Sequence, residues 1–198
     1  RAYGVAETGE FWGYFITEGG GFQCDFPENK GWKEGVFFMT TAEEVFTMAI
    51  HLMDSQRVVI QTIPSFSVTA HGKPLHISAE KPRELFALLV DAGERGLTTS
   101  EGIACLWPDR GNDKSTQALF RMTYKRFVDI LEEAGIADVV SSRDKKRFLM
   151  VDKVDCDLYH ILSGDRKAQK KYAGQYLQEY SWAEDRNAQL YHVLMSKE

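Results

Sequence analysis

The stretch NDKSTQALFRMTYKRFVDILEEA, residues 112–134, contains no Gly or Pro and lies between Gly111 and Gly135. An uninterrupted run of this length predicts one long helix. Asn112 or Asp113 can accept the first free backbone amides as the N-cap, and Gly135 can take the left-handed conformation that ends a helix. Both ends of the predicted helix are therefore signalled.

A wheel of 3.6 residues per turn separates two faces of this helix. The face expected in the core consists of Phe120, Tyr124, Phe127 and Leu131. The opposite face is a cationic stripe of Lys114, Gln117, Arg121 and Lys125. A basic helix face is usually only solvated surface, so its meaning depends on the neighbouring segments.

The composition is that of a globular protein with one domain or two small ones: 198 residues, 43% hydrophobic and 27% charged. No apolar run approaches the roughly 20 residues of a membrane span, and no signal peptide opens the chain. We therefore expect a cytoplasmic protein without membrane contact. The chain begins at Arg1 rather than Met, so we expect a fragment or a processed chain with upstream sequence.

Charge is unevenly distributed. The net charge of −5 argues against a protein that coats nucleic acid indiscriminately. Residues 1–59 carry 4 basic and 9 acidic side chains, whereas residues 110–147 carry 9 basic and 6 acidic ones. This pattern indicates a directed cationic patch on an acidic molecule.

Catalytic and metal-binding signatures are missing from the sequence. The three cysteines, Cys24, Cys105 and Cys156, form no CxxC pair, and the histidines are scattered. No nucleophile elbow, Walker loop or HExxH motif is present. We expect a protein that is not an enzyme and that holds no cofactor or metal.

The segments before the long helix alternate between strand and helix patterns. In residues 1–59, aromatic runs at 10–17 and 22–26 around a glycine cluster predict a β-hairpin, followed by a strand at 36–39 and a helix from 41 to 53. Residues 57–78 predict two or three antiparallel strands with a tight turn at 71–72. Residues 80–92 predict an amphipathic helix that Gly93 ends.

The immediate neighbours of the long helix change its interpretation. Residues 97–100 predict a short strand and an N-cap, and the helix of residues 101–107 ends at Pro108. A short helix, a turn and a longer basic helix form a helix-turn-helix arrangement. Beyond it, strands at 138–140 and 147–151 are expected to flank a polar, basic tip at 141–146, which predicts a wing. Residues 155–198 predict short helices with apolar faces.

Several sequence segments, taken in order, resemble those of a known family. They are SFSV at 65–68, HGKPL at 71–75, KPRELFALLV at 81–90 and CLWPD at 105–109. Residues 60 to about 151 resemble the OmpR-type winged-helix DNA-binding domain, in the form found in regulators of the Streptomyces antibiotic regulatory protein type. Residues 155–185 resemble the start of the bacterial transcriptional activator domain that follows the winged helix in that family.

The chain departs from the family pattern in two places. The long helix of the family usually ends in a Leu-Arg pair, but Phe127 and Val128 occupy the corresponding positions. The activator-like segment is also short, which puts a full helical partner surface in doubt. Residues 1–59 lie outside the resemblance, and a partial receiver domain remains open for them.

The resemblance implies an α+β fold: a winged helix-turn-helix with an N-terminal antiparallel sheet (60–151), a small α+β N-terminal segment (1–59) and a short C-terminal helical extension (152–198). It implies a sequence-specific transcriptional regulator, the effector part of a response regulator or a one-component regulator. Double-stranded DNA is then the main partner, bound by a homodimer or by tandem copies, with RNA polymerase as a further candidate partner.

In a winged helix of this class the long helix enters the major groove of DNA and the wing reaches the adjacent minor groove or backbone. This arrangement implies roles for individual residues. Arg121 and Gln117 are expected to read base edges, and Lys114 and Lys125 to contact phosphates. Arg126 is expected to be a flank contact or an ion-pair partner. On the wing, the expected contacts are Arg143, Lys145 and Lys146, while Arg147 is expected to point inward.

The sequence also allows two other functions. The acidic total charge and the missing arginine at position 128 favour a winged helix that binds another protein. Alternatively, residues 1–59 could bind a small ligand in a pocket lined by Phe11, Trp12, Tyr14, Phe22, Phe26 and Trp32.

Overall fold

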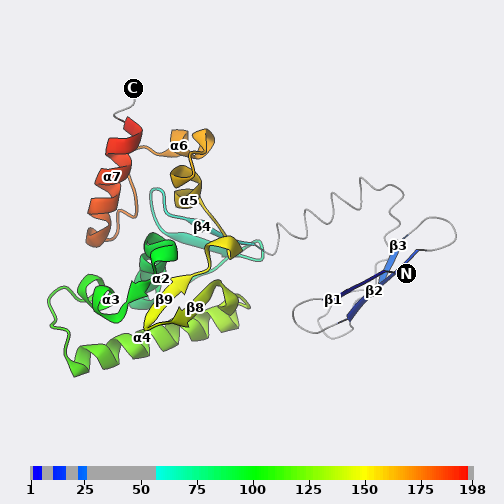
Figure 1. Ribbon diagram of the computed structural model, residues 1–198, viewed down its shortest axis with the longest axis horizontal. Helices are drawn as coiled ribbons and strands as arrows, with labels where there is room; N and C mark the ends of the chain where they lie inside the picture. Colours follow the sequence, from blue (N-terminus) through cyan, green and yellow to red (C-terminus); the bar gives the residue numbers. More distant parts are fainter. Residues whose placement is uncertain (1, 6–10, 17–21, 26–56, 196–198) are drawn as a thin grey trace. The chain divides into compact units, whose positions relative to one another are not determined.

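The computed structural model describes residues 2–5, 11–16, 22–25 and 57–195. The chain divides into two compact units, residues 1–54 and residues 55–198 (Figure 1). The expected boundary between residues 151 and 152 lies inside the second unit.

The first unit contains a three-stranded antiparallel sheet in the order β1-β2-β3. Its strands are β1 (Ala2–Val5), β2 (Phe11–Ile16) and β3 (Phe22–Asp25). Strands β2 and β3 confirm the predicted aromatic hairpin, whereas β1 was not expected. The predicted strand at 36–39, the helix from 41 to 53 and the side chains of the ligand pocket all lie outside the described part of the chain.

The second unit opens with a four-stranded sheet in the order β10-β4-β5-β6. Three strands are antiparallel neighbours, as predicted: β4 (Val58–Gln61), β5 (Ser67–Ala70) and β6 (Lys73–Pro74). His71 and Gly72 both have positive φ, 51° and 72°, which is the two-residue turn that matches strand twist. The fourth strand, β10 (Val154–Cys156), pairs in parallel with β4 and was not predicted.

Three helices follow this sheet. They are α2 (Glu80–Ala92), α3 (Thr99–Leu106) and α4 (Lys114–Glu133), with the short strand β7 (Leu97–Thr98) before α3. Thr98 begins α3 through a capping box, exchanging hydrogen bonds with Glu101. These elements confirm the predicted helices, and α3 begins two residues earlier than expected.

The ends of α4 follow local chemistry. The Asp113 carboxylate accepts a hydrogen bond from the Thr116 amide at 2.8 Å, which makes Asp113 the N-cap. At the other end Gly135 has φ of 70°, its amide donates to the Glu132 carbonyl, and the Ile136 amide donates to the Leu131 carbonyl. This pair of bonds is a Schellman motif, so the predicted glycine stop is confirmed.

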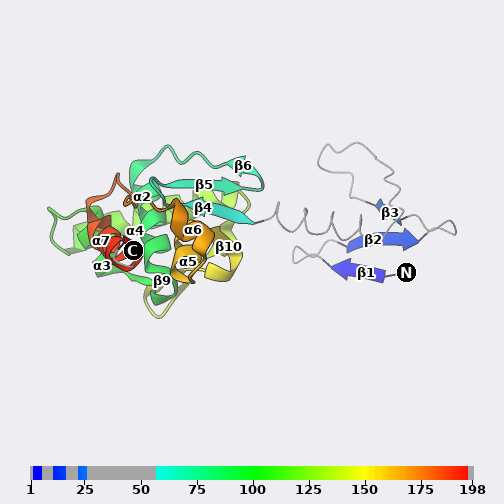
Figure 2. The same cartoon turned by 90° about the horizontal axis from the view of Figure 1, so that it is seen from above.

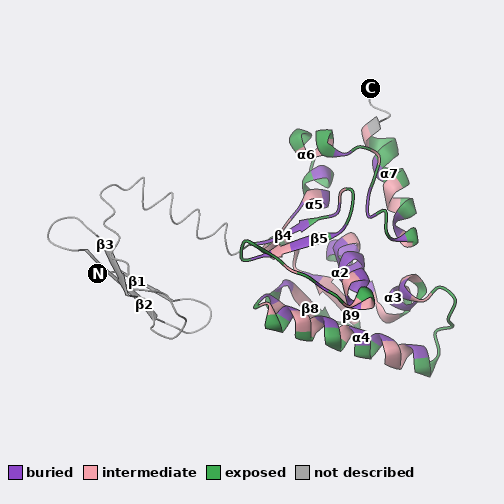
Figure 3. Ribbon diagram, turned by 180° about the vertical axis from the view of Figure 1, so that it is seen from behind, coloured by how far each residue is buried: buried purple, intermediate pink, exposed green. Residues whose placement is uncertain are grey.

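A hairpin and a helical extension complete the unit. The hairpin consists of β8 (Val140–Arg143) and β9 (Lys146–Leu149), and β9 also pairs with β7. The extension contains α5 (Asp157–Leu162), α6 (Arg166–Lys171) and α7 (Glu184–Met195). Figures 1 and 3 show α4 on one side of this unit and α5 to α7 on the opposite side, with α2 between them. Figure 2 shows the sheet strands β4, β5 and β6 side by side from above.

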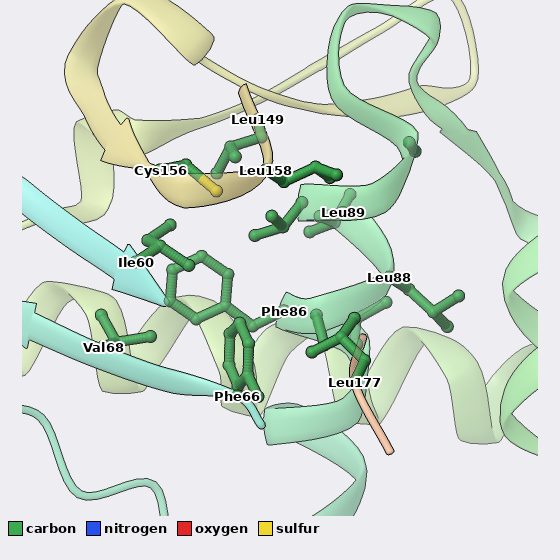
Figure 4. Packing of buried hydrophobic residues seen from close by; sticks show 14 of the residues in the cluster. Ile60, Phe66, Val68, Phe86, Leu88, Leu89, Leu149, Cys156, Leu158 and Leu177 are labelled. Carbon is green, nitrogen blue, oxygen red and sulfur yellow. The ribbon is translucent and has the colours of Figure 1, made fainter. Parts of the chain in front are cut away.

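One hydrophobic core joins the sheet, the helices and the extension (Figure 4). Phe86 of α2 lies at its centre, with ring centroids 5.5 Å from Phe66 and 5.2 Å from Phe127 of α4. Leu158 and Leu177 of the extension are completely buried in the same cluster. The extension is therefore part of the core that positions α4.

Polar contacts also attach the extension to the segment between β4 and β5. The Asp157 carboxylate accepts hydrogen bonds from the Thr62 amide at 2.9 Å, the Thr62 hydroxyl at 2.7 Å and the Ile63 amide at 3.0 Å. Glu179 accepts a further bond from the Phe66 amide at 2.9 Å. Because backbone amides in a buried segment need partners, these carboxylates take the place of a neighbouring strand.

Tyr176 makes the stability of this unit sensitive to alkaline pH. It is buried, and its hydroxyl lies 3.0 Å from Asp91 Oδ1; burial and the Asp91 charge raise the pKa of Tyr176 above its usual range. The folded state thus holds this proton more tightly than the unfolded state, so the contribution of Tyr176 to stability is present below about pH 10 and is lost above it.

Urea denaturation at several pH values above about pH 10 measures this contribution. We expect the free energy of unfolding of Tyr176→Phe to fall less steeply with pH than that of the wild type, by about 1.4 kcal/mol per pH unit. An unchanged slope would contradict this role.

Candidate nucleic-acid interface

The exposed surface of α4 carries four basic side chains, which we call the cationic row. Three of them follow one line along the helix, and the fourth, Arg126, lies about 120° around the helix from that line. Its members are Lys114, Arg121, Lys125 and Arg126, and all four are exposed. None of them takes part in an ion pair with a carboxylate of the described residues. The row is thus free to bind an anionic partner.

The cationic row occupies only the first two thirds of the helix. Asp129, Glu132 and Glu133 are exposed in the last two turns of α4. An acidic end would repel a phosphate backbone, whereas the region of residues 114–126 would attract it. The charge distribution therefore favours the N-terminal part of the helix for contact with an anionic partner.

Gln117 lies differently from the other members of the predicted stripe. Its side chain is half-buried, and its amide Nε2 donates a hydrogen bond to Asn112 Oδ1 at 3.0 Å. Asn112 in turn donates to Ser100 Oγ at 2.8 Å, which links the start of α4 to α3. Gln117 is thus engaged in positioning the helix in this structure, and a role in base reading stays a prediction.

The hairpin beside α4 is tighter than predicted. Its strands, β8 and β9, are joined by Asp144 and Lys145 alone, with φ of 51° and 62°. The predicted hairpin is present, but its strands were expected at 138–140 and 147–151 with a six-residue tip, and these bounds are wrong. The tip is shorter because both turn residues adopt the left-handed conformation and the ladder continues almost to the tip. Residues 137–139 form a 3-10 turn instead.

The predicted wing contacts fall into two groups. Arg143 and Lys145 are exposed, with the Arg143 guanidinium 4.7 Å from the centroid of the Phe148 ring. Lys146 is half-buried, and its ammonium donates to the Arg95 carbonyl at 3.3 Å. Arg143 and Lys145 therefore remain the better placed of the three for an anionic partner.

Arg147 points inward, as predicted. Its guanidinium lies 4.8 Å from the centroid of the Phe120 ring and 5.1 Å from that of Tyr124, and it donates to Thr99 Oγ1 at 2.7 Å. Burial lowers the pKa of Arg147 from its ordinary value. This residue joins the hairpin to α3 and α4.

Tyr124 was expected to be a simple core residue, but the structure gives it a second role. Its ring is half-buried, and its hydroxyl lies 2.8 Å from Ser142 Oγ of β8. A helical wheel identifies the inward position but does not reveal which hairpin strand will meet the ring. The sequence offered no signal for this contact.

Gly102 sets the distance between α3 and α4. A Cβ atom at this position would lie 2.4 Å from the ring of Phe120, which is completely buried. Gly→Ala in a helix usually stabilises by up to about 1 kcal/mol, but overpacking of a core costs about 1–3 kcal/mol. We expect Gly102→Ala to lower the melting temperature, whereas Gly111→Ala, where the space is open, should not. Equal melting temperatures for the two variants would contradict this packing.

The described part of the chain lacks a candidate metal site. No cluster of three or more His, Cys, Asp or Glu side chains occurs there. Within the same residues, no helix is both long enough and apolar enough to cross a membrane.

Comparison with known proteins gives a structural likeness. No family model and no curated protein matches the chain. The structure is similar to that of Mycobacterium tuberculosis EmbR, solved in complex with a low-affinity phosphopeptide, with a TM-score of 0.54 and 18% sequence identity. The match covers 70% of this chain and 43% of the EmbR chain. At this identity the likeness shows the fold alone: a mixed α+β fold related to that of EmbR.

Proposed function

We propose that the second unit is a winged helix-turn-helix DNA-binding domain and that the protein is a transcriptional regulator. Helices α3 and α4 would form the helix-turn-helix, and the β8–β9 hairpin the wing. The observation that carries this proposal is the cationic row, whose four exposed side chains lack carboxylate partners among the described residues. The likeness to EmbR supports a related fold.

In this proposal α4 enters the major groove. Lys114 and Lys125 are 11 residues apart, or about 16 Å along a helix, which is comparable to the roughly 12 Å width of the groove. They are suited to phosphates on its two sides. Arg121 lies between them and could pair with a guanine edge in a bidentate way, while Arg126 would contact the flanking backbone.

The wing and a second copy would supply further affinity. Arg143 and Lys145 would reach the adjacent backbone or minor groove. With about six phosphates neutralised, non-specific binding would have a Kd of only about 10⁻⁴ to 10⁻⁶ M. We therefore propose binding by two copies on neighbouring half-sites, with RNA polymerase as a further candidate partner.

Selection from random double-stranded DNA tests the proposal without knowledge of the operator. We expect enrichment of a defined motif and a binding constant that falls with salt at a log–log slope near −5 for about six phosphates. Lys170→Ala in α6 is the matched control, because it removes an exposed positive charge on the side opposite α4 (Figures 1 and 3). No enrichment and no binding at low salt would refute the proposal.

The acidic end of α4 favours a second candidate function. Asp129, Glu132 and Glu133 present negative charge beside the cationic row, so the same face could bind a protein of mixed charge. A domain that binds no DNA but captures a partner through α4 would support this reading. Charge reversal at Glu132 would then weaken capture, whereas it should strengthen or leave unchanged the binding of DNA.

A further inference from the structure

Arg147 lies at the junction of three elements of the proposed DNA-binding domain. It belongs to β9, its guanidinium contacts the rings of Phe120 and Tyr124 in α4, and it donates to Thr99 in the first turn of α3. No ion pair of the described residues includes it. Its charge is therefore held by aromatic faces and a hydroxyl, which orient the planar guanidinium.

The second strand of the hairpin reaches the same point of α4. Ser142 of β8 lies directly opposite Arg147 in the antiparallel register, and its hydroxyl lies 2.8 Å from that of Tyr124. Both members of this cross-strand pair thus contact one tyrosine. We call the side chains of Arg147, Tyr124 and Ser142 the clasp.

The position of the clasp along the hairpin decides what it can control. Only the pair Arg143–Lys146 separates it from the turn at Asp144 and Lys145. Strand β9 is also paired with β7 at this level, through Leu97–Arg147 and Thr98–Lys146, whereas β8 is the outer strand of the three-stranded sheet. The sheet therefore holds β9, and the contact of Ser142 with Tyr124 attaches the outer strand to α4. Together the clasp residues fix both strands of the hairpin against the helix that carries the cationic row.

We propose that the clasp residues are positioning residues for DNA recognition: they hold the wing at a fixed distance from α4, so that Lys145 and the cationic row meet one duplex together. This inference rests on the proposed function. A rigid wing loses little freedom on binding, whereas a free one must be ordered at the expense of affinity. The clasp would act through Lys145 and Arg143 and would not itself touch DNA.

A double-mutant cycle on the duplex selected by the wild-type protein tests this role. In the wild-type background, we expect Lys145→Ala to weaken binding about 5-fold, as for one lost phosphate contact. In the Arg147→Met background, Lys145→Ala should change binding by less than about 2-fold, because the hairpin is no longer held against α4 and Lys145 is no longer kept on the phosphate backbone. Arg121→Ala, which lies on α4, should weaken binding equally in both backgrounds.

A milder variant separates the loss of the clasp contact from a loss of the fold. Tyr124→Phe keeps the ring and removes only the hydroxyl that meets Ser142, so it should retain the fold and reduce the Lys145→Ala effect in part. Ser142→Ala should behave like Tyr124→Phe, and combining the two should add nothing, because each removes the same contact. Circular dichroism would confirm that each variant is folded at the assay temperature.

Each outcome has a distinct meaning. A full Lys145→Ala effect in both the Arg147→Met and Tyr124→Phe backgrounds would overturn the inference, and so would the absence of any effect of Lys145→Ala in the wild type. A salt slope that loses about one unit in Arg147→Met, while Lys145→Ala keeps its full effect in that background, would instead make Arg147 a direct phosphate contact. If the wild-type protein binds no duplex, the proposed function fails before any variant is measured.

Discussion

Replacement of Asp157 by alanine is expected to lower the free energy of unfolding by about 3–5 kcal/mol, because several partly buried donors lose their acceptor at once. The carboxylate accepts from the amides of Thr62 and Ile63 and from the Thr62 hydroxyl, at 2.7–3.0 Å. Thr62 is completely buried, so water cannot replace the lost bonds easily. Chemical denaturation of the whole chain, read by circular dichroism, measures this change.

Two variants separate this effect from a loss of charge. Asp157→Asn keeps one carbonyl acceptor and should lose less stability than Asp157→Ala. Asp155→Ala, two residues earlier, breaks only the partly exposed contact with His160 and should cost no more than about 1 kcal/mol. If Asp157→Ala and Asp155→Ala were equally mild, the extension would not be held to the β4–β5 segment as the structure indicates.

The sequence predicted the elements whose signals are local. Asp113 and Gly135 mark the two ends of α4 by side-chain capping and by a left-handed stop, and both act within one helical turn. By contrast, β10 has only three residues and pairs in parallel with β4, nearly a hundred residues earlier. Such a short strand has no usable periodicity, so its partner could not be inferred.

The wing shows a different limit of sequence reasoning. Two-residue hairpin turns are usually signalled by Asn-Gly or Asp-Gly, and here the turn is Asp144 and Lys145. A lysine in the left-handed conformation gave no such signal, so the expected tip was too long. The inward position of Arg147 could be predicted, but its contacts with Tyr124 and Thr99 depend on how three elements meet.

The cationic face itself was largely predictable, since exposure follows the helical period. Lys114, Arg121 and Lys125 are exposed as the wheel requires. Gln117 was expected to lie free on the cationic stripe, but its side-chain amide donates a hydrogen bond to Asn112, in the turn before the helix. Contacts of this kind depend on the path of the loop, which the wheel does not contain.

Arg121→Ala and Lys125→Ala are expected to weaken DNA binding in two different ways. If Arg121 pairs with a guanine edge, its loss should cost about 1–3 kcal/mol on the selected motif, or roughly 5- to 150-fold, and should relax the preference at one base pair. If Lys125 contacts a phosphate, its loss should weaken binding to all sequences alike and reduce the salt slope by about one unit.

Fluorescence anisotropy on the selected motif and on a scrambled duplex, at several salt concentrations, distinguishes the two roles. Lys170→Ala controls for the loss of one positive charge and should leave both curves unchanged. Wild-type affinity in both Arg121→Ala and Lys125→Ala would remove α4 from the interface, even if the protein still bound DNA. A uniform loss for Arg121→Ala, without a change in preference, would make it a phosphate contact and leave base reading to a neighbour such as Gln117.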